Sequence, residues 1–545
     1  MYITFMKYFL DHDWQGNMQT PKKKVGEKAK INFLIIFAAI YLIFGLFSHS
    51  PWRPLETNSF SIFANIFFNG DILAPHLASI NNFDHGHIYE ILGAIFAKII
   101  FFLDPHNAAR LSNLLWIALT MISIGLTNRE LRGFGYGRQS NIIFLSSVGL
   151  FFTLHTFTHE IAILAAVSIS LYSFSLSHRR PFRASILLGI SLIIGLLSKG
   201  LIYLIPIIGI SATLAILPNW NYKRTVIFTG LGLLSSLFFI GIWLFLLSLY
   251  HPDSLVKFLS PTINFSTENI KYYFINMLWF AWPAVPLFIF TLFTELSTFL
   301  KYKRTNLPLV FIAWFFLLLI CESQISQVKL MVLLPAIAIM ASTSIDTLQR
   351  GASGALNWFG ILIFSAITLI LWIGWFALSF GIPYKIHERM VYLSGNFVPE
   401  LNFFHIFLAL IFLAVWVISL WKNNLTNRSS VTNWALGITL VWVTTTLLWF
   451  PMIENRKDYG QIFKKITAIN VPTNQCMTTN DLNDSYIDLI FYFTQIDIRK
   501  NDKNCKYTVA HKDIRSISND PEFKSSILWE GKMPNDKKTF YIIKN

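Results

Sequence analysis

Long apolar runs recur along the chain from residue 31 to residue 451, and this feature limits the possible folds most strongly. An apolar run of about 20 residues is long enough to cross the hydrocarbon core of a membrane as a helix. Charged residues make up 13% of the chain, which is about half the usual share in a soluble domain. The pattern therefore predicts an all-α polytopic membrane protein, not a series of soluble domains.

We predict thirteen membrane-spanning helices, which lie at 31–48, 109–127, 140–156, 160–177, 184–198, 200–217, 225–249, 272–296, 306–321, 329–345, 355–380, 402–421 and 431–450. Lysine and arginine favour cytoplasmic loops. The cluster PKKKVGEKAK makes residues 1–30 a cytoplasmic tail, and no small-residue cleavage site follows the first span, which predicts a retained anchor. Later basic loops, such as HRRPFR and KYKR, fall on the same side, whereas HTFTHE and CESQISQVK fall on the other.

The segment 88–103 is apolar but carries Glu90 and Lys98. As a helix it would reach roughly 24 Å, which is short of the roughly 30 Å hydrocarbon core. If it crossed the membrane, every later basic loop would lie outside, against the charge rule. We therefore predict that it lies in the outer interface, within one long periplasmic loop that covers residues 49–108.

The composition changes after the transmembrane domain of residues 31–451, and residues 452–545 predict a small periplasmic α/β domain. The segments 455–469 and 484–496 have the periodicity of amphipathic helices, and 506–511, 525–531 and 539–545 have that of short strands. Cys476 and Cys505 both lie in this domain. Outside the cytoplasm they can form a disulfide, and the alternative is two free thiols.

The formal net charge is +15, and the excess of lysine and arginine lies largely in the short loops and the tails. This is the distribution expected of a membrane protein whose orientation is set by its basic loops. The chain has no basic patch interleaved with aromatic residues, so no nucleic-acid partner is expected. Ionisable residues near membrane depth are costly and often mark function. Here they gather in the predicted outer loops, which carry Arg53, Glu56, Asp71, His76, Asp84, His85, His87, Glu90, His155, His159, Glu160 and Lys199.

The stretches WRPLETNSF, GDILAPHL, LLSKGLIYLIP and VKLMVLLPAIAIMA follow one another in this order along the chain. Together they resemble four motifs of GT-C glycosyltransferases, the superfamily of the protein O-mannosyltransferases and the bacterial lipid A aminoarabinose transferases. The stretch WRPLETNSF is similar to their W-x-P-D-E-T/A, and GDILAPHL to their G-D-W-x-x-P-H-L. LLSKGLIYLIP resembles T-K-G-x-x-x-x-x-P, with Lys199 at the lysine. VKLMVLLPAIAIMA resembles R-Y-x-L-P-x-x-P-A-L-A, with Lys329 near the basic position. The resemblance covers residues 30–345.

The resemblance implies transfer of a sugar from a polyprenyl phosphate to an acceptor hydroxyl at the outer leaflet. It implies no nucleotide cofactor, because the donor arrives through the membrane. A carboxylate takes the proton of the attacking hydroxyl. The anomeric carbon gains oxocarbenium character, and fixed cations or a divalent metal stabilise the departing phosphate.

Three departures from the motifs bear on this chemistry. Leu55 stands where the family has its first acid, and Phe83, Asp84, His85 and Gly86 stand where it has F-E-K-P. Pro261 lies near the place of a family histidine. Either Glu56 or Glu160 is then the catalytic base, or catalysis has been lost.

The remaining candidates each have a simpler alternative. We expect Arg53, Lys199, His85 and Lys329 to bind substrate, although Lys199 can also extend from a span end to the interface and Arg53 can pair with Glu56. Glu56 and Glu160 can also be acids at helix N-termini. Asp84 and His87 are candidate metal ligands, and the alternative is a solvated polar loop.

We predict an inner-membrane glycosyltransferase whose active site and C-terminal domain face the periplasm. Its partners are a polyprenyl-phosphate-linked sugar, a lipid or glycan acceptor and membrane lipids. One alternative is an inactive relative that binds polyprenyl lipids. A second is a lipid or glycolipid transporter, for which charged or broken helices at the bilayer midplane would be expected.

Overall fold

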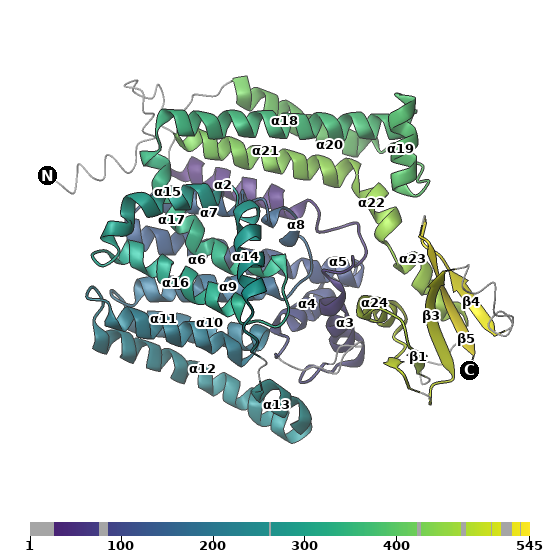
Figure 1. Cartoon of the computed structure of the whole chain (residues 1–545), viewed down its shortest axis with the longest axis horizontal. Helices are drawn as coiled ribbons and strands as arrows, with labels where there is room; N and C mark the ends of the chain where they lie inside the picture. The colour runs from purple at the N-terminus through teal and green to yellow at the C-terminus, as the bar shows by residue number, and fades with distance from the viewer. Residues whose placement is uncertain are drawn as a thin grey trace.

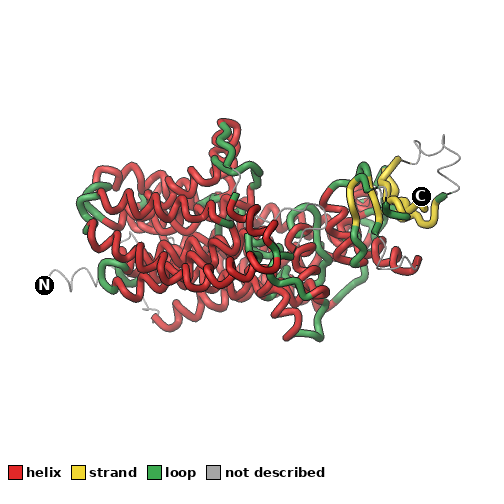
Figure 2. Tube along the Cα trace, turned by 90° about the horizontal axis from the view of Figure 1, so that it is seen from below, coloured by secondary structure: helices red, strands yellow, loops and turns green. Residues whose placement is uncertain are grey.

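The computed structural model describes residues 27–75, 85–260, 263–421, 427–469, 476–502, 504–513, 526–534 and 536–544. Most of these residues form one bundle of α-helices, and a small sheet lies at one end of it (Figure 1). In the perpendicular view the bundle is elongated and the strands are confined to that same end (Figure 2). The predicted division into a helical membrane domain and a C-terminal α/β domain is confirmed.

The helices of the bundle are α2 (Glu27–Ile43), α3 (Thr57–Ala64), α4 (Ile88–Ile99), α5 (Pro105–Arg110), α6 (Ser112–Arg132), α7 (Tyr136–Leu145), α8 (Leu150–Thr153), α9 (Glu160–Leu176), α10 (Pro181–Lys199), α11 (Leu204–Ile216), α12 (Tyr222–Tyr250), α13 (Pro252–Leu259), α14 (Thr267–Phe280), α15 (Ala284–Glu295), α16 (Lys303–Ile320), α17 (Leu334–Thr347), α18 (Arg350–Phe380), α19 (Tyr384–Ser394), α20 (Phe403–Trp421), α21 (Asn427–Leu448) and α22 (Phe450–Lys457). Four further segments are not α-helical: the π-helical turn η1 (Asn65–Asn69) and the 3-10 helices η2 (Leu201–Tyr203), η3 (Leu296–Thr298) and η4 (Gln327–Leu333).

Each predicted span coincides with helix in the structure. Among the described residues, eight helices are long and apolar enough to cross a membrane, or nine if α14 and α15 form one bent span. The sequence predicted thirteen. The difference arises because α2, α9 and α11 are shorter apolar helices and the predicted span 140–156 is broken into α7 and α8. The chain is a multi-pass membrane protein, and the side on which each loop lies remains a prediction.

Helices α9 and α17 form the centre of the bundle, because nearly every side chain on them is buried. Large apolar side chains of α12 and α20 are exposed instead. In a water-soluble protein such surfaces would be unstable, whereas in a membrane they contact lipid.

Two predicted spans are broken, and the breaks meet. Helices α14 and α15 are bent by 104°, and Pro283 lies between them; proline has no backbone N–H to continue a helix. The backbone N–H of Val148 donates to the carbonyl of Trp282 at 2.9 Å, and that of Gly149 to Phe280 at 2.7 Å. A Cβ on Gly149 would lie 2.2 Å from the Phe280 ring, so this close approach requires glycine. The two breaks thereby satisfy each other's backbone groups at membrane depth.

The segment between α2 and α6 contains only short helices, as predicted for the long outer loop. Helices α3, α4 and α5 and the turn η1 pack together there, and α4 is 12 residues long. That length is too short to cross a membrane as a straight helix. Helix α3 also packs against α24 (Asp484–Thr494) of the C-terminal domain.

The C-terminal domain is a five-stranded mixed sheet with its own apolar core. Its elements are α23 (Gly460–Phe463), η5 (Lys464–Ile469), β1 (Met477–Thr479), α24, β2 (Ile498–Lys500), β3 (Tyr507–Asp513), β4 (Ile527–Gly531) and β5 (Lys538–Lys544). The strand order is β2-β1-β3-β5-β4, in which β1 is parallel to β2 and β3, and β5 is antiparallel to β3 and β4.

Helix α24 and strands β3, β4 and β5 confirm the predicted pattern. The predicted helix 455–469 is instead divided among α22, α23 and η5, and the three-residue strands β1 and β2 were not predicted. The disulfide between Cys476 and Cys505 is present. It connects the residue before β1 to the residues before β3.

Candidate active site

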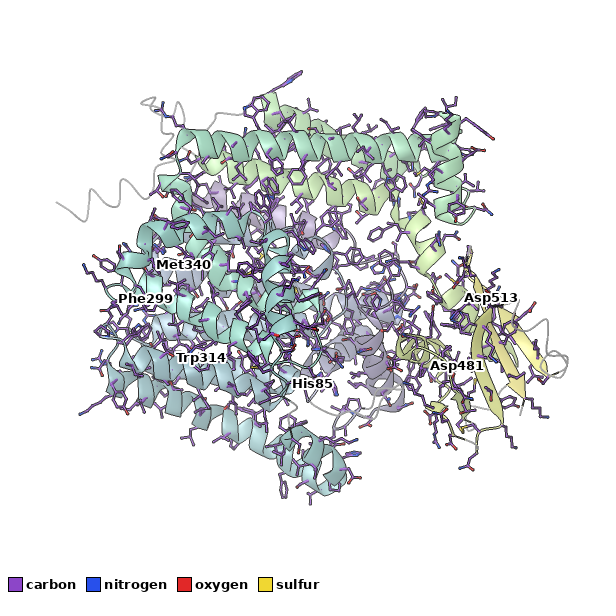
Figure 3. The ribbon with its side chains drawn as sticks, in the orientation of Figure 1. His85, Phe299, Trp314, Met340, Asp481 and Asp513 are labelled. Carbon is purple, nitrogen blue, oxygen red and sulfur yellow. A yellow bond between two sulfur atoms is a disulfide. The ribbon has the colours of Figure 1, made fainter. Side chains whose placement is uncertain are left out.

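The candidate site residues gather at the end of the bundle nearest the C-terminal sheet. His85 lies at this end in Figure 3, whereas Phe299 lies at the other. Gly200 follows the last residue of α10 and has φ +74°, a conformation that glycine adopts without strain. Lys199 is therefore the last residue of α10, and Glu160 is the first residue of α9, which packs against it.

Glu56 is completely buried in an ion pair with Arg110. Arg110 donates from Nε to Oε1 at 2.9 Å and from a terminal nitrogen to Oε2 at 2.8 Å. The backbone N–H groups of Phe157 and Trp52 donate to the same two oxygens, at 2.7 and 2.9 Å. Burial alone would raise the pKa of Glu56, but the charge and hydrogen bonds of Arg110 outweigh it and hold the pKa below its usual value.

This geometry gives Glu56 a bracing role. It precedes α3 directly, but its side chain makes no capping hydrogen bond to that helix. It joins the outer loop to α5 and to the turn before α9 instead. Arg110 was not among the predicted site residues, although an arginine at the start of the apolar run 109–127 is a signal that a buried partner exists.

Four ionisable side chains form what we call the charged network: Glu160, Lys199, Glu322 and Lys329. Lys199 Nζ lies 3.4 Å from Glu160 Oε1 and 3.0 Å from the Glu322 carboxylate. Lys329 Nζ donates to Glu322 Oε2 at 2.5 Å and to the Gln324 carbonyl at 2.6 Å. Glu322 thus bridges the two lysines, which belong to different elements, α10 and η4.

The charged network is largely buried and electrically balanced, with two carboxylates and two ammonium groups. Glu160 and Glu322 are 5% and 6% exposed. Among the described residues, Glu160 Oε2 is buried and has no hydrogen-bond partner. That oxygen is free to accept a proton or a hydroxyl hydrogen, unlike either oxygen of Glu56.

Glu322 is not among the predicted site residues, and the sequence pattern places its loop, CESQISQVK, only on the side opposite the basic loops. The signal was present, because Glu322 follows directly on the apolar run 306–321, and an acid at that depth usually has a partner. Only the fold shows that its partners come from α10 and η4.

Three histidines lie beside the charged network, and we call them the histidine cluster: His85, His87 and His159. The His85 ring lies 4.4 Å from that of His87 and 4.9 Å from that of His159, between centroids. His159 Nε2 is 3.8 Å from Glu160 Oε1. His87 Nδ1 is 4.0 Å from Oε2 of Glu90, and burial raises the pKa of Glu90.

The predicted metal site receives no support from this cluster. Asp84 and Pro261 lie outside the described residues. Within the part of the chain that is described, one group brings three metal-type ligand atoms within 4.8 Å of one another: Cys476, Asp502 and Cys505. The two thiols of that group form the disulfide and cannot act as thiolate ligands. The predicted pair of metal ligands, Asp84 and His87, stays a prediction, because only His87 is among the described residues.

Arg53 contacts the C-terminal domain. Its Nε donates to Ser485 Oγ at 2.7 Å, and its guanidinium lies 3.4 Å from the centroid of the Tyr486 ring. Beside it, Glu454 of α22 accepts from the backbone N–H of Ser50 and from Trp52 Nε1, both at 2.6 Å. We call these contacts the clasp, because they tie the outer loop to α22 and α24.

Two neighbouring cavities lie near the loop that joins Glu322 to Lys329. One has a volume of about 540 Å³, and its walls include Leu55, Tyr272 and residues 325–328, the segment between Glu322 and Lys329. The other, of about 780 Å³, is almost wholly apolar and lies between α14, α15, α18 and α21. Val148, Phe151 and Trp279 line both cavities, so residues of the broken spans form walls of each.

The side chain at position 55 therefore faces a cavity, as a catalytic group would. It is leucine, where the resemblance implies an acid. The cavity wall carries no charge at this position.

Comparison with known proteins identifies the fold. The chain is similar to the crystal structure of ArnT from Cupriavidus metallidurans bound to undecaprenyl phosphate, with a TM-score of 0.69, 12% identity, and coverage of 95% of this chain and 98% of that one. The apo form of the same protein gives a TM-score of 0.69 with 94% of this chain covered. The oligosaccharyltransferase AglB from Archaeoglobus fulgidus gives 0.48 at 11% identity, covering 88% of this chain and 69% of that one. No protein-family model matches the chain, and no curated protein does.

The likeness to ArnT extends over nearly the whole of both chains, so the chain has the fold of the ArnT structure. This is the GT-C fold that the four sequence motifs predicted.

Proposed function

We propose that this protein is a glycosyltransferase that transfers a sugar from a polyprenyl-phosphate donor to a hydroxyl of a lipid or glycan acceptor. The observation that carries the proposal is the charged network of two lysines and two carboxylates. Its member Lys329 directly follows the segment 325–328, which lines a cavity that adjoins an apolar one. A lipid-linked phosphate and an attacking hydroxyl require this combination of groups.

The apolar cavity suits the isoprenoid chain of the donor. Its walls are aromatic and aliphatic side chains, among them Trp279, Trp282 and Trp434. The ArnT structure of the same fold contains undecaprenyl phosphate. With the chain in this cavity, the phosphate would enter the neighbouring cavity and approach the loop 325–328.

Lys199 and Lys329 are the groups proposed to meet the donor phosphate. Both are held by Glu322. A phosphate that accepts from the lysines would replace part of this pairing, and the fixed ammonium groups would stabilise the charge that grows as the phosphate leaves. His85, which lies next to His159, is a further proposed phosphate contact.

Glu160 is the proposed general base. Its Oε2 would accept the proton of the acceptor hydroxyl. The oxygen of that hydroxyl then bonds to the anomeric carbon. The bond from that carbon to the phosphate oxygen breaks, and its electron pair leaves with the polyprenyl phosphate. In this mechanism Glu56 and Arg53 do not contact substrate; Glu56 stabilises the outer loop through Arg110, and Arg53 attaches that loop to the C-terminal domain.

The proposed location is the bacterial inner membrane, with the charged network, the outer loop and the C-terminal domain in the periplasm. The basic loops support this orientation. A disulfide in the C-terminal domain is also typical of an oxidising compartment.

A second candidate is an inactive relative that binds polyprenyl phosphate without transferring sugar. Leu55 favours it, because the position implied to carry the acid faces the cavity with an apolar side chain. The two candidates share lipid binding and differ in turnover.

Both are tested with the full-length protein in lipid nanodiscs. Binding of undecaprenyl phosphate is measured first, and then release or transfer of label from radiolabelled undecaprenyl-phosphate hexose, amino sugar and pentose. Turnover that Glu160→Gln abolishes supports the transferase. Binding without turnover, with turnover gained in Leu55→Asp, supports the inactive relative. Absence of lipid binding contradicts both.

A further inference from the structure

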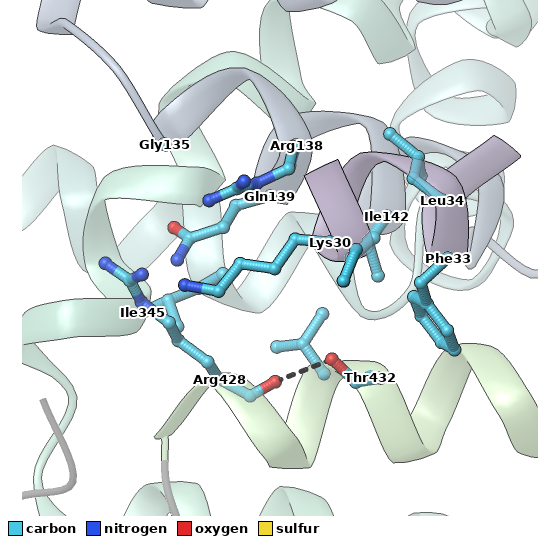
Figure 4. Close-up of a pocket in the computed structure, with 12 residues that line it drawn as sticks. Lys30, Phe33, Leu34, Gly135, Arg138, Gln139, Ile142, Ile345, Arg428 and Thr432 are labelled. Atoms are coloured by element: carbon cyan, nitrogen blue, oxygen red, sulfur yellow. Dashed lines mark hydrogen bonds between the residues drawn. The ribbon is translucent and has the colours of Figure 1, made fainter. Parts of the chain in front are cut away.

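A second pair of cavities lies at the opposite end of the bundle. The first, of about 320 Å³, lies between α2, α7, α17 and α21 (Figure 4). The second, of about 150 Å³, lies between α2, α20 and α21. Phe33 lines both, so the two cavities adjoin.

The location follows from the direction of the helices. The first cavity contains Lys30 near the start of α2 and Arg428 near the start of α21. The clasp, with Trp52 and Glu454, follows the ends of the same two helices. Helix α21 has 22 residues, a length of roughly 33 Å, which matches the membrane core. The cavity pair and the charged network therefore belong to opposite membrane faces.

The first cavity is rich in positive charge. Lys30, Arg138 and Arg428 line it, and their side chains extend toward one another in Figure 4. Asp346 pairs with Arg428, with contacts of 2.9 and 3.0 Å, and fixes the direction of its guanidinium. Among the described residues, three cationic side chains therefore line this one cavity.

Gln139 adds an independent observation. Its side chain lines the same cavity and is 8% exposed, and among the described residues neither its Nε2 nor its Oε1 has a hydrogen-bond partner. A buried amide without hydrogen-bond partners destabilises the fold. An anionic group bound between Gln139 and Arg138 would accept from Nε2 of the amide and so satisfy its donor.

The second cavity has the opposite character. Apolar side chains such as Ile36, Phe37, Phe412 and Val415 form its walls, with Ser419 and Thr439 as its hydroxyl groups. A cationic cavity that adjoins an apolar one fits an amphiphile, with an anionic head in the first and an alkyl chain in the second. Basic pockets between membrane helices bind anionic lipid headgroups in this manner.

We propose that these adjoining cavities bind an anionic glycerophospholipid at the membrane face opposite the charged network. Lys30, Arg138 and Gln139 hold the phosphodiester, and an acyl chain passes Phe33 and lies along α2 toward Val415. The site ties α2 to α7 and α21, and it is separate from the proposed donor cavity.

The test is native mass spectrometry of the delipidated full-length protein with phosphatidylglycerol or phosphatidylcholine. We expect phosphatidylglycerol to bind at least about tenfold more tightly, a difference of about 1.4 kcal/mol. Arg138→Gln and Gln139→Leu should each weaken its binding several-fold. Val415→Phe narrows the second cavity without changing any charge, and it should also weaken binding. The matched control is Arg180→Gln, which removes an exposed arginine at the same end of the bundle and should change nothing.

Four results would overturn the proposal. Equal affinity for phosphatidylglycerol and phosphatidylcholine would show that the cationic side chains do not select an anionic headgroup. Unchanged binding in all three cavity variants would place the lipid elsewhere. Displacement of the lipid by millimolar inorganic phosphate would identify a simple anion site. Displacement by undecaprenyl phosphate at concentrations far below those of phosphatidylglycerol would identify a second polyprenyl site.

Discussion

Arg110 donates to both carboxylate oxygens of Glu56, and neither side chain is exposed to solvent. The pair joins α5 to the residue before α3 at the base of the outer loop. Removing one partner of such a pair leaves a buried charge without compensation.

Glu56→Gln should therefore lower the free energy of unfolding by about 3–5 kcal/mol, measured by thermal or chemical unfolding in detergent. The matched control is Glu130→Gln, which breaks the pair with Arg179, whose side chain is 61% exposed. Surface pairs contribute about 0–1 kcal/mol. Equal effects of the two substitutions would contradict the structural role of Glu56.

Glu160→Gln should reduce turnover by about 10²–10⁴-fold if Glu160 is the general base, because the amide cannot accept the hydroxyl proton. Affinity for undecaprenyl phosphate should change little. Glu160→Asp should retain part of the activity, since it keeps a carboxylate near Lys199. The measurement is transfer of labelled sugar together with lipid binding, and a fall in binding equal to the fall in turnover would instead indicate a purely structural residue.

Glu454 should make stability depend on pH. Burial raises the pKa of this carboxyl group from 4.5 to about 7 in the folded protein. Between these values the folded protein binds more protons than the unfolded chain, so stability falls as the pH rises through this range. The free energy of unfolding should fall by up to about 3 kcal/mol over this range. Glu454→Gln should not show this fall, because an amide does not titrate. The melting temperatures of the wild type and of Glu454→Gln, measured from pH 5 to pH 8, test this prediction. If the two melting temperatures change with pH in parallel, Glu454 is not the source of the pH dependence.

Replacing both Cys476 and Cys505 by serine should destabilise the C-terminal domain. The disulfide closes a loop with a sequence separation of 29, for which chain entropy predicts about 3–4 kcal/mol. Protease resistance of the domain in the intact protein is the measurement. Reduction of the wild-type protein should reproduce the result, and Cys321→Ser, which changes the free cysteine, should not.

Arg53→Met should loosen the clasp while leaving the charged network intact. The substitution removes the hydrogen bond to Ser485 and the cation–π contact with Tyr486, and each contributes about 1 kcal/mol. Faster hydrogen exchange is expected in residues 50–56 and in α24. Loss of undecaprenyl-phosphate binding without such a change in exchange would restore Arg53 as a substrate contact.

The order and period of the apolar residues determined the membrane class, the helix ranges, the short helices of the outer loop and most of the C-terminal domain. These features depend on local sequence, because an apolar segment becomes a helix in lipid whatever its neighbours are. The pairing of Cys476 with Cys505 and the GT-C fold were also predictable, from the expected compartment and from the order of the motifs. The bend at Pro283 could not be predicted from the apolar pattern, because a straight span and a broken span have the same apolar composition.

The partners of the charged side chains depended on the tertiary structure. Glu56 and Glu160 are both acids at helix starts in the outer part of the chain, and nothing in the local sequence ranks one above the other. The fold places Arg110 against Glu56, and Lys199 beside Glu160. An ionisable group takes its role from the charges and solvent around it. Those neighbours are distant in the chain, since Arg110 is 54 residues from Glu56 and Lys199 is 39 residues from Glu160.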